Sequence, residues 1–380
     1  MEGLDTAIIN LNTTRNLLDG ENITLHYTPI LQENPRDGLI SQYSSMGPSA
    51  DGYGKPAVGA PGANIPTLAP GNNYMIQSGT SFSAPYYSSM LALLLQDARR
   101  KGQMLKPDVA RALMLNGATS VMLDDDIPGP AFTVLQGSGV ANLTATLDAT
   151  TYALPDILNL NDTYNGVSKS HTIEVVNMGS EETTFTILHQ PALTGYVLDD
   201  GTIQPRTWLP EHSTDSAEVD FPTTLTVSAN SSASFDVNFS YKDIDDHRLP
   251  VYSGWIVLES PESRLQVSYN GIAGDLSKMQ VLDNTDDLFQ QGFPVPFAFR
   301  QSDKNLIDTV DSFSMIGLDK PAVIYRLTGP SPYLRIDLVD DTAKRNVING
   351  VLNWMNDIFG DDERSAKSGV LYEELGVSRK

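Results

Sequence analysis

The sequence predicts an α/β unit followed by an all-β sandwich. Two helix-forming stretches between residues 86 and 116, with short β-like runs ahead of them, indicate the α/β unit. After Leu154-Pro155, apolar and polar residues alternate with a period of two, and Gly, Asn, Ser and Pro separate the runs, which is typical of antiparallel strands. A chain of 380 residues is long enough to hold two or three compact domains.

Two helices are predicted in the first unit. Residues 86–101, YYSSMLALLLQDARRK, are apolar on nearly every side before a basic last turn, and Gly102 follows where helices commonly end. We therefore expect this helix to be buried in a domain core. Residues 106–116 predict a second helix that covers a sheet face, because Pro107 suits its first position and Gly117 follows its end.

The later runs of alternating residues predict the strands of the sandwich. These runs are residues 171–179, 183–189, 234–241, 253–260 and 264–271. We divide the chain into a first segment at 1–38, the α/β unit at 39–150, the sandwich at 151–275, a further β region at 276–342 and a tail at 343–380. The tail is interpreted either as one amphipathic helix or as a gene-model artefact.

The composition argues against several classes of function. The formal net charge of -22 would repel phosphate backbones and anionic membranes, so nucleic-acid binding is disfavoured. No run approaches the roughly 18 apolar residues of a membrane-spanning helix, and the first residues do not predict a signal peptide. The chain has no cysteine, and its acidic runs lack alternating oxygen ligands, so we expect no metal site and no cofactor.

Asn-X-Ser/Thr sequons, which accept glycans only in a secretory pathway, occur at Asn12, Asn22, Asn142, Asn161, Asn230 and Asn238.

The stretch SGTSFSAP, residues 78–85, holds the candidate catalytic residue Ser81. A serine hydroxyl becomes a good nucleophile when a base accepts its proton and hydrogen-bond donors stabilise the oxyanion that forms. A helix N-terminus offers such donors in its free N–H groups, and Gly79 allows a tight turn into the helix. Thr80 and Ser81 could equally be ordinary helix-capping residues, so the tripeptide alone leaves both interpretations open.

Three linked segments around this serine resemble the C-terminal part of the catalytic domain of subtilases, the subtilisin-like serine proteases of peptidase family S8. The family pattern is Phe-Ser-Ser-X-Gly-Pro, then Lys-Pro-X-X-X-Ala-Pro-Gly-X-X-Ile, then Gly-Thr-Ser-X-X-X-Pro. The resemblance implies a parallel-sheet α/β domain in which Ser81 is the nucleophile and Gly79 and Thr80 support the turn and the oxyanion site. Departures are mild, with Tyr43 where Phe is usual and Phe82-Ser83 where Met-Ala is common. The matching residues are Ser44, Ser45, Gly47, Pro48, Lys55, Pro56, Ala60, Pro61, Gly62, Ile65, Gly79, Thr80, Ser81 and Pro85.

The later part of the chain resembles a companion domain of large secreted subtilases, a fibronectin-III-like sandwich that follows the catalytic unit. The segments 249–255 and 267–275 resemble its Tyr-X-Gly strand and its Pro-Tyr-X-Gly end, with Ser268 in place of the proline. Residues 1–38 resemble the chain as it re-enters the catalytic domain after a protease-associated insertion. The resemblance implies an extracellular protein that acts on proteins or peptides.

The serine lacks the partners that the family would provide. Subtilases carry Asp, His and Ser in that order, with the His in a His-Gly-Thr motif. His26 is followed by Tyr-Thr, and in Asp5-Thr6-Ala7 the apolar residues follow the aspartate, whereas the family's strand precedes it. Neither Asn10 nor Asn12 has the neighbouring glycine of the family's oxyanion asparagine. The other histidines follow the serine, at His171, His189, His212 and His247.

We therefore interpret the chain as part of a longer secreted serine endopeptidase, which forms an acyl-enzyme on Ser81 and is almost inactive without its histidine and aspartate. The alternative is a non-catalytic binding or adhesion module derived from a subtilase. The sequence alone leaves both interpretations open.

Overall fold

The computed structural model describes residues 38–49, 52–124, 126–163, 169–196, 198, 211–241, 248–282, 296–307, 312–327 and 369–374. The predictions made for residues 1–37, and for a helix between 343 and 368, lie outside these ranges.

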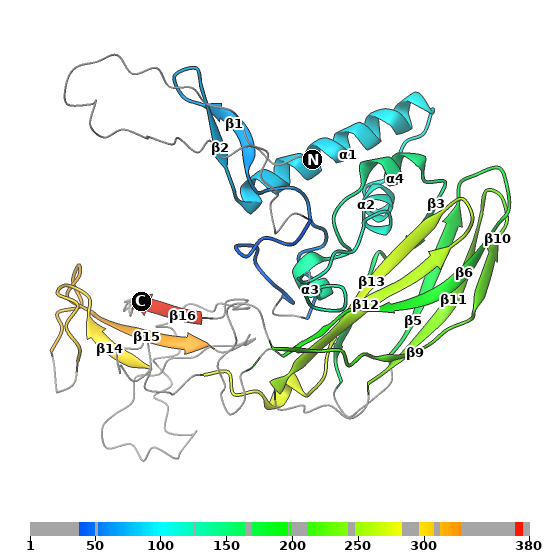
Figure 1. The fold of residues 1–380 in the computed structure, drawn as a ribbon. Helices are drawn as coiled ribbons and strands as arrows, with labels where there is room; N and C mark the ends of the chain where they lie inside the picture. Colours follow the sequence, from blue (N-terminus) through cyan, green and yellow to red (C-terminus); the bar gives the residue numbers. More distant parts are fainter. Residues whose placement is uncertain are drawn as a thin grey trace, which may run out of the picture.

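The two helices predicted in the first unit are confirmed, as α1 (Thr80–Arg100) and α2 (Pro107–Asn116) (Figure 1). The end of α1 closes in a Schellman motif, because Gly102 N–H donates to Arg99 O at 3.1 Å and Gln103 N–H donates to Ala98 O at 2.8 Å. Two short helices follow, α3 (Thr133–Gln136) and α4 (Leu143–Asp148).

The parallel sheet implied by the resemblance is not confirmed among the described residues of this unit. Backbone pairing there consists of a hairpin and isolated bridges, of which Gly59 with Val140 is parallel and Val58 with Gly137 is antiparallel. The hairpin joins β1 (Ile65–Ala69) to β2 (Asn73–Gln77) and exposes Leu68 and Tyr74 on one face.

The burial expected for α1 is wrong within the part of the chain that the structure describes. Only Met90, Leu94 and Ala98 are buried, whereas Tyr86 and Leu93 are 40% and 48% exposed. Apolar residues occur on most sides of this helix, but α2 and α4 pack against one side of it (Figure 1). Burial depends on tertiary partners, which the helical pattern does not specify.

The predicted sandwich is confirmed, with a core of apolar side chains between two sheets. The order in the larger sheet is β10 (Thr224–Val227), β6 (Thr183–Pro191), β12 (Pro250–Glu259), β13 (Arg264–Ile272) and β4 (Ile157–Asp162). In addition, β7 (Thr194–Tyr196) pairs with β12, and β8 (His212–Ser213) pairs with β7. The order in the smaller sheet is β3 (Thr151–Leu154), β5 (Lys169–Asn177), β11 (Ser231–Ser240) and β9 (Glu218–Asp220).

The central strands β12 and β13 are buried on both faces, because the first unit covers their outer face. Phe132, Val134 and Leu135 form a second apolar cluster with Val251 and Ile272 of these strands. The helix α3 accordingly lies against β12 and β13 (Figure 1).

A third, smaller sheet follows the sandwich. It contains β14 (Phe297–Arg300), β15 (Pro321–Leu327) and β16 (Gly369–Glu374), all paired antiparallel. A 3-10 turn at Leu276–Lys278 follows β13, and Arg300 forms an ion pair with Asp319. Two of these strands therefore lie in the predicted region 276–342, and β16 lies in the predicted tail.

Candidate active site

Ser81 is the second residue of α1 and is exposed to solvent. The position that precedes the helix is occupied by Gly79, and no side chain caps the helix there. The interpretation of Thr80 and Ser81 as ordinary capping residues is therefore wrong, because both residues already lie inside the helix. The first turn also contains no acidic side chain.

The turn that leads into α1 is held by the backbone of the Ala-Pro-Gly segment. Gly79 N–H donates to Gly62 O at 2.8 Å, and the hydroxyl of Tyr43 donates to the same carbonyl at 2.9 Å. On the other side of the turn, Asn64 N–H donates to Ser78 Oγ at 2.8 Å. The structure thus brings together all three sequence segments that carried the resemblance.

The glycines of these segments are required by close backbone approach. A Cβ atom on Gly62 would overlap Ser83 Oγ and would lie 2.9 Å from Gly79 O. A Cβ atom on Gly47 would overlap the carbonyl of Lys55. Gly47 therefore lets the first segment pack against the second, and Gly62 lets the second pack against the start of α1.

The first turn of α1 offers hydrogen-bond donors near Ser81, which are one of the two requirements for acyl transfer to a serine. The N–H groups at a helix N-terminus have no partners within the helix, and together with the helix dipole they favour negative charge nearby. No carboxylate of the first turn competes for them. This end of α1 is thus suited to stabilise an oxyanion beside the serine.

The second requirement is a base that accepts the proton of Ser81, and the histidines that the structure describes do not supply it. His171, His189 and His212 lie on β5, β6 and β8, all of them sandwich strands. His189 Nε2 lies 2.8 Å from the Tyr269 hydroxyl, and burial lowers the pKa of its imidazole to about 4. Burial, and next the charge of Lys169, lower the pKa of His171.

The remaining candidates from the sequence lie outside the described residues. They are His26, His247, Asp5, Asn10 and Asn12. Among the described residues, no partner for the Ser81 hydroxyl is found.

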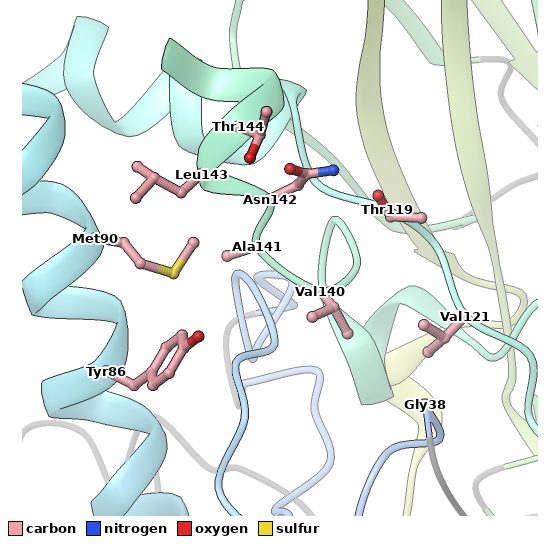
Figure 2. Close-up of a pocket in the computed structure, with 10 residues that line it drawn as sticks. All are labelled: Gly38, Tyr86, Met90, Thr119, Val121, Val140, Ala141, Asn142, Leu143 and Thr144. Carbon is pink, nitrogen blue, oxygen red and sulfur yellow. The ribbon is translucent and has the colours of Figure 1, made fainter. Parts of the chain in front are cut away.

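A cavity of about 480 Å³ lies beside α1 but does not include Ser81. Tyr86 and Met90 of α1 face Val140 and Leu143 across it (Figure 2). Its residue Asn142 is engaged in capping α4, because its side chain accepts a hydrogen bond from Ala145 N–H at 3.1 Å. Because Ser81 is not among the residues that line the cavity, the cavity is not the place where the serine would react.

Two features of the site were not predicted from the sequence. The hairpin β1–β2 separates the Ala-Pro-Gly segment from the serine, and its only local signal is Gly71-Asn72, both with positive φ. Tyr43 counted as a departure from the family pattern, yet its hydroxyl binds the carbonyl that also anchors Gly79.

Among the described residues, no three His, Cys, Asp or Glu side chains come together in a way that could hold a metal ion. Within the same residues, no helix is long and apolar enough to cross a membrane.

Two family models match the chain. Residues 12–139 match the model described as the subtilase family, and residues 158–269 match an Fn3-like domain.

Curated relatives include three proteases. A C5a peptidase from Streptococcus pyogenes is 25% identical over 277 residues, which are 69% of this chain and 23% of that protein. Pyrolysin from Pyrococcus furiosus is 37% identical over 110 residues, or 28% of this chain and 8% of that protein. A PIII-type proteinase from Lactococcus lactis is 23% identical over 290 residues, or 71% of this chain and 14% of that protein. The chain thus matches less than a quarter of the length of each of these three relatives.

Proposed function

We propose that Ser81 is the nucleophile of a serine endopeptidase, because residues 12–139 match the subtilase family model and residues 158–269 match that of an Fn3-like domain. One observation carries the proposal. Ser81 is exposed in the first turn of α1, and the three motif segments hold the turn that presents it.

The chemistry follows from this position. The Ser81 oxygen attacks the scissile carbonyl carbon, its proton passes to a base, and the carbonyl oxygen becomes an oxyanion that the N–H groups of the first turn stabilise. Collapse of the tetrahedral intermediate breaks the C–N bond, and the leaving amine takes the proton from the base. Water then hydrolyses the acyl-enzyme by the same route and releases Ser81.

We propose that the base and its orienting carboxylate come from polypeptide beyond these 380 residues. No histidine of the sequence lies in a His-Gly-Thr motif, and the described histidines belong to the sandwich. In subtilisin, loss of the histidine alone lowers kcat roughly a million-fold. The isolated chain should therefore be almost inactive. We propose in addition that the protein acts on proteins or peptides and that it is extracellular. Its exposed Asn-X-Ser/Thr sequons would then carry glycans.

The nucleophile is tested by labelling with a fluorophosphonate probe and mapping the modified residue by mass spectrometry. We expect negligible labelling of the 380-residue chain, and rapid labelling of Ser81 in a longer polypeptide that includes the upstream reading frame. Ser81→Ala should abolish that labelling, because no other hydroxyl occupies this position.

The matched control is Ser89→Ala on the same helix, where the exposed hydroxyl only donates to Pro85 O at 2.8 Å. This variant should be labelled like the parent. Efficient labelling of Ser81 in the 380-residue chain would show that the base lies within it. A longer polypeptide that is not labelled at Ser81 would refute the catalytic role and leave a binding module.

A further inference from the structure

Two side chains of the Fn3-like domain donate hydrogen bonds to one carbonyl oxygen of the unit that carries Ser81. Trp255 Nε1–H donates to Ser138 O at 3.1 Å, and the Gln266 side-chain amide donates to the same oxygen. The hydroxyls of Ser138 and Ser268 lie 3.1 Å apart. All four residues are at most 1% exposed, so water does not compete for these hydrogen bonds.

The turn that contains Ser138 is hydrogen-bonded to residues 57–59, which lie in the segment that leads to the site. Ser138 N–H donates to Ala57 O at 2.9 Å, Gly59 N–H donates to Gly139 O at 2.8 Å, and Ala141 N–H donates to Gly59 O at 2.9 Å. The segment 57–59 is therefore hydrogen-bonded along its length to residues 138–141.

The turn is closely packed against neighbouring backbone. A Cβ atom on Gly137 would overlap the backbone of Ala57, and one on Gly139 would overlap the backbone of Thr119. Both glycines have positive φ, 67° and 124°. Closely packed backbone of this kind transmits a displacement instead of absorbing it.

Three residues further along the chain, the same segment reaches the turn before the serine. After Gly59 come Ala60, Pro61 and Gly62, and the carbonyl of Gly62 accepts the hydrogen bond from Gly79 N–H at 2.8 Å. Hydrogen bonds and covalent backbone thus connect β12 and β13 of the Fn3-like domain, without a break, to the turn before Ser81.

We propose that Trp255 and Gln266 are positioning residues for Ser81. By fixing the Ser138 carbonyl they fix the segment 57–62, and that segment fixes the entry turn of α1. This makes the Fn3-like domain a structural part of the catalytic site. The inference rests on the proposed function of Ser81 for its importance, but its geometry can be tested without catalysis.

The test is amide hydrogen exchange at Gly79 in the 380-residue chain, read by NMR or by mass spectrometry of short peptides. Gln266→Met removes the amide donor at similar side-chain length, and Trp255→Phe removes the indole donor while Gln266 remains. Each variant should raise the exchange rates of Gly59, Ala141 and Gly79 about tenfold or more, beyond what its global stability explains.

The matched control is Val237→Ala in the core of the opposite sheet, compared at equal global stability set by denaturant. It should leave Gly79 exchange at the level that global unfolding dictates. If Gly59 exchanges faster but Gly79 does not, or if Gly79 merely follows the control, the positioning role is refuted. Should Gln266→Met fail to fold, Trp255→Phe decides the question.

The outcome is independent of the labelling experiment. Amide exchange at Gly79 requires no reaction at Ser81, so a serine that fails to label leaves this test standing. Conversely, a Gly79 amide that is insensitive to both variants leaves the nucleophile proposal intact.

Discussion

Single glycines decide how closely the segments around Ser81 approach one another. Gly62 lies against Ser83 and Gly79, whereas a Cβ atom on Gly59 would meet its nearest neighbour at an ordinary 3.5 Å. These two glycines are three residues apart in the same segment, so they make a matched pair for testing what close approach contributes.

Gly62→Ala should lower the free energy of unfolding by about 1–3 kcal/mol, because the added methyl overpacks the entry turn of α1. Gly59→Ala should change it by well under 1 kcal/mol, since the space for a methyl is present. Urea denaturation followed by circular dichroism measures both values. Equal costs for the two substitutions would contradict the assignment of Gly62 to a steric role.

At the scale of elements, the strands β12 and β13 are joined by reciprocal pairs of tyrosine and glycine. In their register Tyr252 lies opposite Gly271, and Gly254 lies opposite Tyr269. A Cβ atom on Gly271 would overlap the Tyr252 ring, and one on Gly254 would lie 2.8 Å from the Tyr269 hydroxyl. The two Tyr-X-Gly segments noted in the sequence thus interlock, with each ring covering the glycine of the other strand.

Gly271→Ala should therefore destabilise the sandwich by about 1–3 kcal/mol, through a clash with Tyr252. Tyr252→Leu leaves a cavity and should also destabilise it, but the double variant should cost less than the sum of the two. A double-mutant cycle by urea denaturation measures this coupling, which we expect to exceed about 0.5 kcal/mol. Additive effects would show that ring and glycine do not share the space.

The elements that could be predicted from the sequence are those with local causes. Gly102 and Pro107 mark helix ends through backbone conformation, and alternation marks the sandwich strands, so these were confirmed. The exposure of Leu93 on α1 was not predictable, because it depends on which segments pack against the helix. Likewise the motif predicts Ser81 as the nucleophile from local sequence, whereas the hydrogen bond from Trp255 to Ser138 joins residues 117 apart in the chain.

At the scale of the whole molecule, acid should weaken the fold through partly buried histidines that are neutral in the folded state. His189 is the clearest case, since its pKa is lowered to about 4 from 6.5, and its imidazole contacts the buried Tyr269 hydroxyl. A lowered pKa in the folded state means that the unfolded chain binds the proton more readily. The stabilisation is complete above about pH 6.5, falls as the pH decreases toward 4, and is lost below that value.

The measurement is the urea midpoint of the 380-residue chain between pH 7.5 and 4, compared with that of His189→Gln. Glutamine keeps an acceptor for the Tyr269 hydroxyl but does not titrate. His171 and the many carboxylates also titrate in this range, so only the difference between the two chains reports on His189. That difference should shift in favour of the variant as the pH falls from 6.5 to 4. Parallel pH profiles would contradict the lowered pKa, because they would show that protonation of His189 does not weaken the fold.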